Sequence, residues 1–104
     1  MTDFKDRERA EEAHFAHDQE MLFRIQARRN RLLGEWAAEL LGKTGEDAKA
    51  YALSVVTSDF EEPGDEDVFR KIAADLDGKA DEAAIRAKMV ALVSVARQQL
   101  IDEI

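Results

Sequence analysis

The scarcity of helix-breaking residues is the feature that most constrains how this chain folds. Only one proline and five glycines occur among its 104 residues, and the rest is rich in alanine, leucine, glutamate, arginine and lysine. These residues have high intrinsic helix propensities. No stretch of alternating β-branched residues is long enough to form a strand. The sequence therefore predicts an all-α fold.

The few turn-forming residues divide the chain into four helical segments. Gly42 and Gly78 each follow an apolar stripe, as a glycine that ends a helix does. Pro63–Gly64 ends the second segment. Asp65 and Asp81 stand where a capping carboxylate begins the third and fourth segments. The helices are expected at about residues 3–42, 45–61, 66–77 and 82–103.

Each segment carries apolar side chains at helical spacing, which predicts that one face of every helix is buried. These side chains are Leu22, Ile25, Leu32, Leu33, Trp36, Leu40, Leu41, Ala48, Tyr51, Ala52, Val55, Phe60, Val68, Phe69, Ile72, Ala73, Leu76, Ile85, Met89, Leu92, Val93, Ala96 and Leu100. We assign Trp36 and Phe60 to core packing rather than to a cofactor site. The pattern predicts a four-helix bundle-like domain with short loops.

Charge and composition exclude several classes of protein. With 23 acidic and 15 basic residues the formal charge is −8, which argues against nucleic acid or an anionic membrane surface as the main partner. The chain has no cysteine, so disulfides and thiolate metal sites are excluded and a reducing cytoplasm is compatible. No apolar run approaches the roughly 18 to 20 residues that span a bilayer. The charged N-terminus is unlike a signal peptide, so we expect a cytoplasmic protein without direct membrane insertion.

The first twenty residues differ from the rest of the chain. Ten charged residues lie between Asp3 and Glu20, and the only large apolar side chains there are Phe4 and Phe15. At about 100° per residue these two phenylalanines fall within about 20° of one helix face, together with Leu22. We interpret residues 1–20 as a mobile, partly helical docking arm that becomes ordered on a partner, and 21–104 as the four-helix domain. A solvated, charge-paired helix or tail with no role is the alternative.

Two sequence motifs resemble ligand-binding loops and are rejected. Gly42-Lys43-Thr44 lacks the glycine of a phosphate-binding loop five residues earlier, where Ala37 stands, and follows a helix instead of a strand. The acidic run from Asp59 resembles a calcium loop, but Arg70 occupies the twelfth position, where a bidentate glutamate belongs. An inter-helix turn with capping acids is the better interpretation of that run.

No catalytic grouping stands out, because Ser54, Ser58 and Ser94 have no nearby histidine in the sequence and no nucleophile-elbow context. His14 and His17 are three residues apart, too few ligands for a metal site, and a modest pH response suits them better. We therefore predict no catalytic residue, no metal and no required cofactor.

An arginine cluster in the first segment has two interpretations. Its members are Arg24, Arg28, Arg29 and Arg31. Such a cluster can bind an anion or a phosphate group, including a weakly bound nucleotide. It can equally be a solvated face that pairs with the acidic loop before the third helix.

Three blocks of the chain resemble one known family. Asp6–Asp18, Ala27–Gly42 and Asp59–Leu76 are similar, in order and spacing, to the zeta subunit of alphaproteobacterial F-type ATP synthases. The likeness covers nearly the whole chain, and only residues 78–84 are less distinctive. The resemblance implies a four-helix protein whose N-terminal region inhibits ATP hydrolysis, wedged between the alpha and beta subunits and touching the gamma subunit.

In that picture the arm supplies the contacts with the partner. Phe4 and Phe15 would anchor it, the charged side chains would add polar contacts, and His14 and His17 would confer pH sensitivity. The candidate partner-binding residues are Phe4, Arg7, Glu8, Arg9, Glu11, Glu12, His14 and Phe15. The protein would be monomeric when free and peripheral to the inner membrane through the synthase. A small helical sensor that binds a nucleotide or other anion at the arginine cluster, and a purely structural assembly factor, are the alternatives.

Overall fold

The computed structural model describes the backbone of residues 2–58 and 65–103 and the side chains of residues 19–58 and 65–103. It contains four helices in these residues: α1 (Thr2–Leu40), α2 (Gly45–Ser58), α3 (Glu66–Asp75) and α4 (Glu82–Asp102). No strand occurs in the described part of the chain. The all-α prediction and its four segments are confirmed, with the ends of α1 and α3 shifted by two residues at most.

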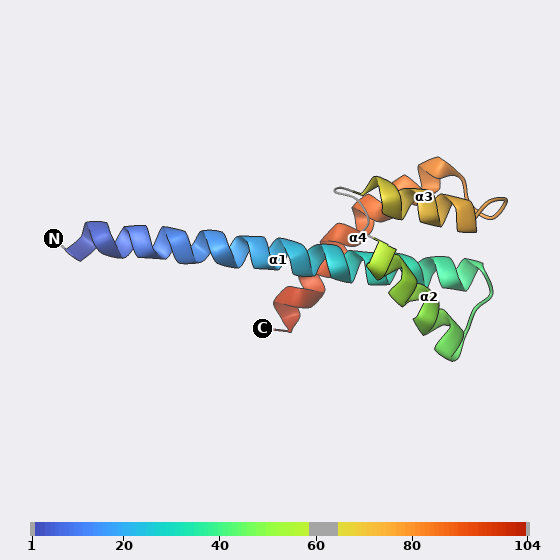
Figure 1. Ribbon diagram of the computed structural model, residues 1–104, viewed down its shortest axis with the longest axis horizontal. Helices are drawn as coiled ribbons and strands as arrows, with labels where there is room; N and C mark the ends of the chain where they lie inside the picture. The colour runs from blue at the N-terminus through green and yellow to red at the C-terminus, as the bar shows by residue number, and fades with distance from the viewer. Residues whose placement is uncertain (1, 59–64, 104) are drawn as a thin grey trace.

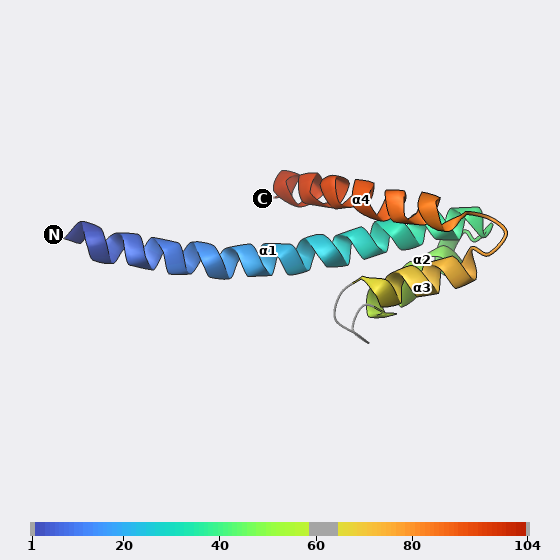
Figure 2. The same ribbon diagram turned by 90° about the horizontal axis from the view of Figure 1, so that it is seen from above.

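The long first helix determines the shape of the molecule. At about 1.5 Å per residue, its 39 residues span about 58 Å, and the whole molecule measures 64 × 25 × 21 Å. The C-terminal half of α1 packs against α2 and α4, and α3 packs mainly against α2 and α4. In Figures 1 and 2 the N-terminal half of α1 extends beyond all the other helices. The described residues therefore form a compact body from α2, α3, α4 and the C-terminal half of α1, and the N-terminal half of α1 protrudes from it.

Local signals in the sequence end α1 and begin α4 as expected. Gly42 has φ +76°, and the amides of Gly42 and Lys43 donate to the carbonyls of Glu39 and Ala38, which is the Schellman arrangement. Asp81 caps α4, because its Oδ1 accepts a hydrogen bond from the Ala84 amide at 2.7 Å. The connections on both sides of the α2–α3 pair are thus encoded locally.

The core lies where α3 and α4 meet the C-terminal half of α1 and one face of α2. It contains Leu33, Ala37, Val55, Val68, Phe69, Ile72, Leu76, Ile85, Met89 and Leu92. Most of these are the side chains that the helical spacing predicted. Ala37 is buried although the stripe did not include it, because two helices pack on different sides of α1 and together cover more than one stripe.

Three sequence predictions are corrected by the structure. Leu22 and Leu40 were expected in the core but are 54% and 39% exposed. Leu22 precedes Ile25, the first buried side chain of α1 in the described residues, and Leu40 belongs to the last turn of the helix. Asp65 stands at the N-cap of α3 but makes no capping bond, since its carboxylate instead accepts from Arg29. Phe60, also expected in the core, lies outside the described residues.

A close backbone approach joins α1 to α2. A Cβ atom added to Gly34 would lie 2.6 Å from the Cα of Ala52. Real Cβ contacts are not this short, so the two helices can pack at this distance only because residue 34 has no side chain. Gly34 thus sets how closely α2 approaches the long helix.

A polar contact links α2 to α3. The Tyr51 hydroxyl donates a hydrogen bond of 2.8 Å to Asp75 Oδ2, which also accepts from Lys71 at 3.1 Å. Burial, and then the bond to Asp75, raise the pKa of the Tyr51 hydroxyl well above its ordinary value. The neutral phenol is therefore the form that the folded state favours.

This contact predicts a loss of stability at alkaline pH. The contribution of Tyr51 is complete below the pKa of an unfolded tyrosine, about 10, and falls as pH rises above that value. Tyr51 is the only tyrosine, so its absorbance change on ionisation is unambiguous. We expect the midpoint of the folded protein above that of the protein in urea, and Tyr51→Phe to lose less stability than wild type above pH 10. Equal midpoints would contradict the contact.

Candidate partner-binding site

The predicted arm coincides with the protruding part of α1. The backbone from Thr2 onward is helical, which confirms that the N-terminal segment is at least partly helical. The side chains of the candidate contact residues lie outside the described residues. They are Phe4, Arg7, Glu8, Arg9, Glu11, Glu12, His14 and Phe15, and the same holds for His17. Their roles therefore stay predictions.

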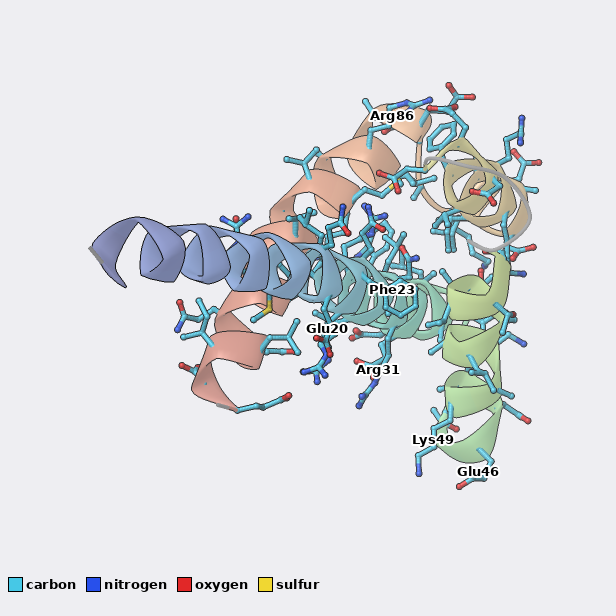
Figure 3. The ribbon with its side chains drawn as sticks, turned by 60° about the vertical axis from the view of Figure 1, so that its left-hand side comes forward. Glu20, Phe23, Arg31, Glu46, Lys49 and Arg86 are labelled. Carbon is cyan, nitrogen blue, oxygen red and sulfur yellow. The ribbon has the colours of Figure 1, made fainter. Side chains whose placement is uncertain are left out.

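The base of the arm is exposed and charged. From residue 19 to residue 24 every side chain is exposed except that of Met21, which is half-buried. Glu20 and Arg24 form an ion pair of 2.6 Å one helical turn apart. Figure 3 shows Glu20 and Arg31 on the same side of α1, away from α3. The helix face that Leu22 shares with Phe4 and Phe15 in the sequence pattern is thus not covered by the other helices at the position of Leu22.

The arginine cluster is divided between different neighbours. Arg24 and Arg31 are exposed and pair with Glu20 and Glu35 within α1 itself, at 2.6 and 3.2 Å. Arg28 pairs with the end of α4, and Arg29 is buried and pairs with Asp65 just before α3. The last pair agrees with the interpretation that the cluster contacts the acidic loop before the third helix.

This division bears on the predicted anion site. Each of the four arginines already has a carboxylate partner. A bound phosphate or nucleotide would therefore have to displace carboxylates from side chains that point in different directions. The anion site stays a prediction that no contact of the described residues favours.

A groove of about 520 Å³ lies between α1, α3 and α4. Its lining residues are Arg29, Asp65, Glu66, Arg86, Met89, Val90, Val93 and Ser94. The Arg86 guanidinium stacks over the Phe69 ring at 3.8 Å and donates to both carboxylate oxygens of Glu66, at 3.2 and 3.3 Å. Figure 3 shows Arg86 where α4 meets α3. The basic groups of the groove are therefore also paired.

Sequence reasoning missed the long-range pairs of this region. Arg86 and Glu66 are twenty positions apart, and Arg28 and Glu103 are seventy-five apart. Asn30, a fully buried residue whose Oδ1 accepts from Arg29 Nε at 2.7 Å, was not predicted in the core either. No periodic signal in one sequence identifies such pairs, because they depend on how helices cross.

The described residues hold neither a metal-binding cluster nor a membrane-spanning helix. No group of three or more histidine, aspartate and glutamate side chains there could hold a metal ion. In the same part of the chain no helix is both long enough and apolar enough to cross a membrane.

Together these features define a small all-α protein of four helices with a projecting N-terminal helix. The sequence pattern of the family described as ATPase inhibitor subunit zeta matches residues 1–99, and the chain belongs to this family. A protein whose structure was solved by solution NMR is 57% identical, covers 81% of this chain and 99% of its own length, and has a TM-score of 0.76. No curated protein matches the chain significantly. The resemblance found from the sequence is thus confirmed, and the family is one of regulatory ATPase subunits.

Proposed function

We propose that this protein inhibits ATP hydrolysis by F-type ATP synthase. In this proposal the N-terminal half of α1 inserts at a catalytic interface between an alpha and a beta subunit and contacts the gamma subunit. The observation that carries the proposal is the projecting helix, because residues 2–24 alone span about 35 Å at the usual rise per residue. A rod of that length can reach into an interface while the four-helix body stays outside.

The mechanism requires no catalytic residue in this chain. A rotary enzyme passes through several conformations, and a ligand that binds one of them better than the others shifts the population toward it. A helix inserted between catalytic subunits would stabilise a single rotary state and so stop turnover. Phe4 and Phe15 would supply the apolar anchors on one helix face, and the charged residues between them the polar contacts.

Titration of the catalytic sector of an F-type ATP synthase from a related alphaproteobacterium tests the proposal. We expect the full chain to inhibit ATP hydrolysis at about one copy per enzyme, and a chain that starts at Met21 not to inhibit, because it lacks the arm. Phe4→Ala and Phe15→Ala should each weaken inhibition about tenfold or more, the loss of one well-packed anchor at an interface.

The matched control is Leu53→Ala, which removes an exposed apolar side chain from α2 on the body. This variant should inhibit like wild type, and circular dichroism should show that all variants stay helical. Inhibition that survives deletion of the arm would contradict the proposal. The alternative of an anion sensor predicts instead that ligand affinity is retained without the arm and lost with the arginines, whereas an assembly factor survives both changes.

A further inference from the structure

Two consecutive arginines occupy the place where α1 leaves the four-helix body. Ile25 is the first buried side chain of α1 in the described residues, and Arg28 and Arg29 follow one turn later. Their side chains reach two different elements of the body. This arrangement concerns how the projecting helix is held and not what it touches at its far end.

Arg28 connects α1 to the last turn of α4. Its Nη1 lies 2.8 Å from Glu103 Oε1, its Nη2 donates to Glu103 Oε2 at 3.0 Å, and Nη1 also donates to Gln99 Oε1 at 2.9 Å. The guanidinium side chain is only 20% exposed. A bidentate pair with a third hydrogen bond fixes the orientation of the guanidinium group relative to the end of α4, whereas a single contact would not. In Figure 2 the C-terminal end of α4 lies alongside α1.

Arg29 connects α1 to the start of α3. Its Nη2 donates to Asp65 Oδ1 at 2.7 Å, and its Nε donates to Asn30 Oδ1 at 2.7 Å. The side chain is buried, whereas that of Asp65 is half-exposed. Asp65 makes no capping bond to α3, so its carboxylate serves the arginine. Burial and two bonds leave this guanidinium little freedom.

Consecutive side chains on a helix point about 100° apart around its axis. The two arginines therefore tie α1 to the body in two directions, toward α4 and toward α3, at nearly the same height. The C-terminal half of α1 is already held by its packing against α2 and α4, so the two ties act where that packing ends and restrain bending of the projecting part toward either side. We infer that Arg28 and Arg29 are positioning residues that fix the direction in which α1 projects, and that inhibition depends on this direction. The second part of the inference rests on the proposed function.

Another arginine of the same helix provides a matched control. In the described residues Arg24 forms its ion pair with Glu20 of α1 itself, and Arg31 forms its ion pair with Glu35, each four residues away. The charge of Arg31 also acts on Glu103 and helps to lower the pKa of that carboxyl, so Arg24 is the cleaner control. Removing Arg24 changes the charge of the chain by the same amount as removing Arg28 but breaks no ion pair between α1 and another element. If only the charge of these arginines mattered, removing any one of the four would have the same effect on the direction of α1 and on inhibition.

The direction of the helix can be measured on the full chain without any ATPase. The chain contains no cysteine, so spin labels can be placed at Leu22→Cys, an exposed position of α1 outside the arm, and at Ala83→Cys on α4. Double electron–electron resonance should give one narrow distance distribution for wild type and for Arg24→Ala, and broader ones for Arg28→Ala and Asp65→Asn. The exchange Arg28→Glu with Glu103→Arg should restore the narrow distribution, which an anion-binding role of Arg28 would not produce.

Inhibition is then measured with the same variants. If untying lowers the population of the competent direction to a tenth, the apparent affinity falls about tenfold. Glu103→Gln tests the same tie at the end of the chain if Arg28→Ala proves poorly folded. Unchanged distance distributions in Arg28→Ala, Glu103→Gln and Asp65→Asn would overturn the inference, as would broadened distributions with unaltered inhibition. If the wild-type protein does not inhibit ATP hydrolysis but the variants change the distance distributions as expected, the proposed function is wrong. The positioning role of Arg28 and Arg29 is then still supported.

Discussion

Leu33→Ala is expected to lower the free energy of unfolding by about 3 to 5 kcal/mol, the upper part of the range for a leucine truncated in a core. Leu33 has no exposed surface and belongs to the central cluster. The loss combines the transfer of the removed atoms with the cavity they leave, because α1 is tied to α3 and α4 and cannot easily move in to fill it. A domain of this size has only about 5 to 15 kcal/mol of stability.

Urea denaturation followed by the fluorescence of Trp36, the single tryptophan, measures this loss. The matched control is Leu53→Ala, because Leu53 is 62% exposed and its truncation should cost less than about 1 kcal/mol. If the two leucine variants lost similar stability, the position of Leu33 in the core would be wrong.

Gly34→Ala should destabilise the protein by about 2 kcal/mol, although alanine is the better helix former. Propensity alone favours the alanine by about 1 kcal/mol. The added Cβ, however, would lie 2.6 Å from the Cα of Ala52 and 3.2 Å from its carbonyl oxygen. These are backbone positions that no rotamer change can relieve, so α2 must move away from α1, and overpacking of this kind costs about 1 to 3 kcal/mol or more.

Two further variants separate crowding from other causes of instability. Ala52→Gly combined with Gly34→Ala should restore little, since the nearest atom to the new Cβ is the Cα of residue 52, which remains. Gly42→Ala places a side chain in open space at φ +76°, so only the left-handed conformation is penalised, by about 1 to 2 kcal/mol. Thermal unfolding of the three variants measures both effects. A stabilised Gly34→Ala would show that α1 and α2 are not packed closely.

Leu33 and Gly34 illustrate how differently the sequence informs on two neighbouring residues. Leu33 belongs to the apolar stripe and could be predicted in the core. Nothing in the spacing distinguishes Gly34 from a weak point in the helix, because its role depends on which part of α2 crosses it. The same difference separates the ends of the helices, which local residues such as Gly42 and Asp81 encode, from the contacts between them.

The candidate site shows the same division. The sequence identified the arm by its charge and by the two phenylalanines on one face, and identified the arginine cluster as a group. It did not show that Arg24 and Arg31 pair within α1 while Arg28 and Arg29 bind other elements. It also placed Leu22 in the core and gave Asp65 a capping role, since a stripe does not indicate where the body stops covering it.

The sequence by itself determined the all-α class, the four helices and the family, because helix propensity, turn residues and family-specific blocks all act over short stretches of chain. Only the tertiary structure decided how closely α2 approaches α1 and which arginines connect the projecting helix to other elements. It also decided where along α1 the other helices stop covering its apolar face. These depend on atoms that are 18 to 75 residues apart in the sequence, from the Gly34–Ala52 pair to the Arg28–Glu103 pair, and meet only when the helices cross.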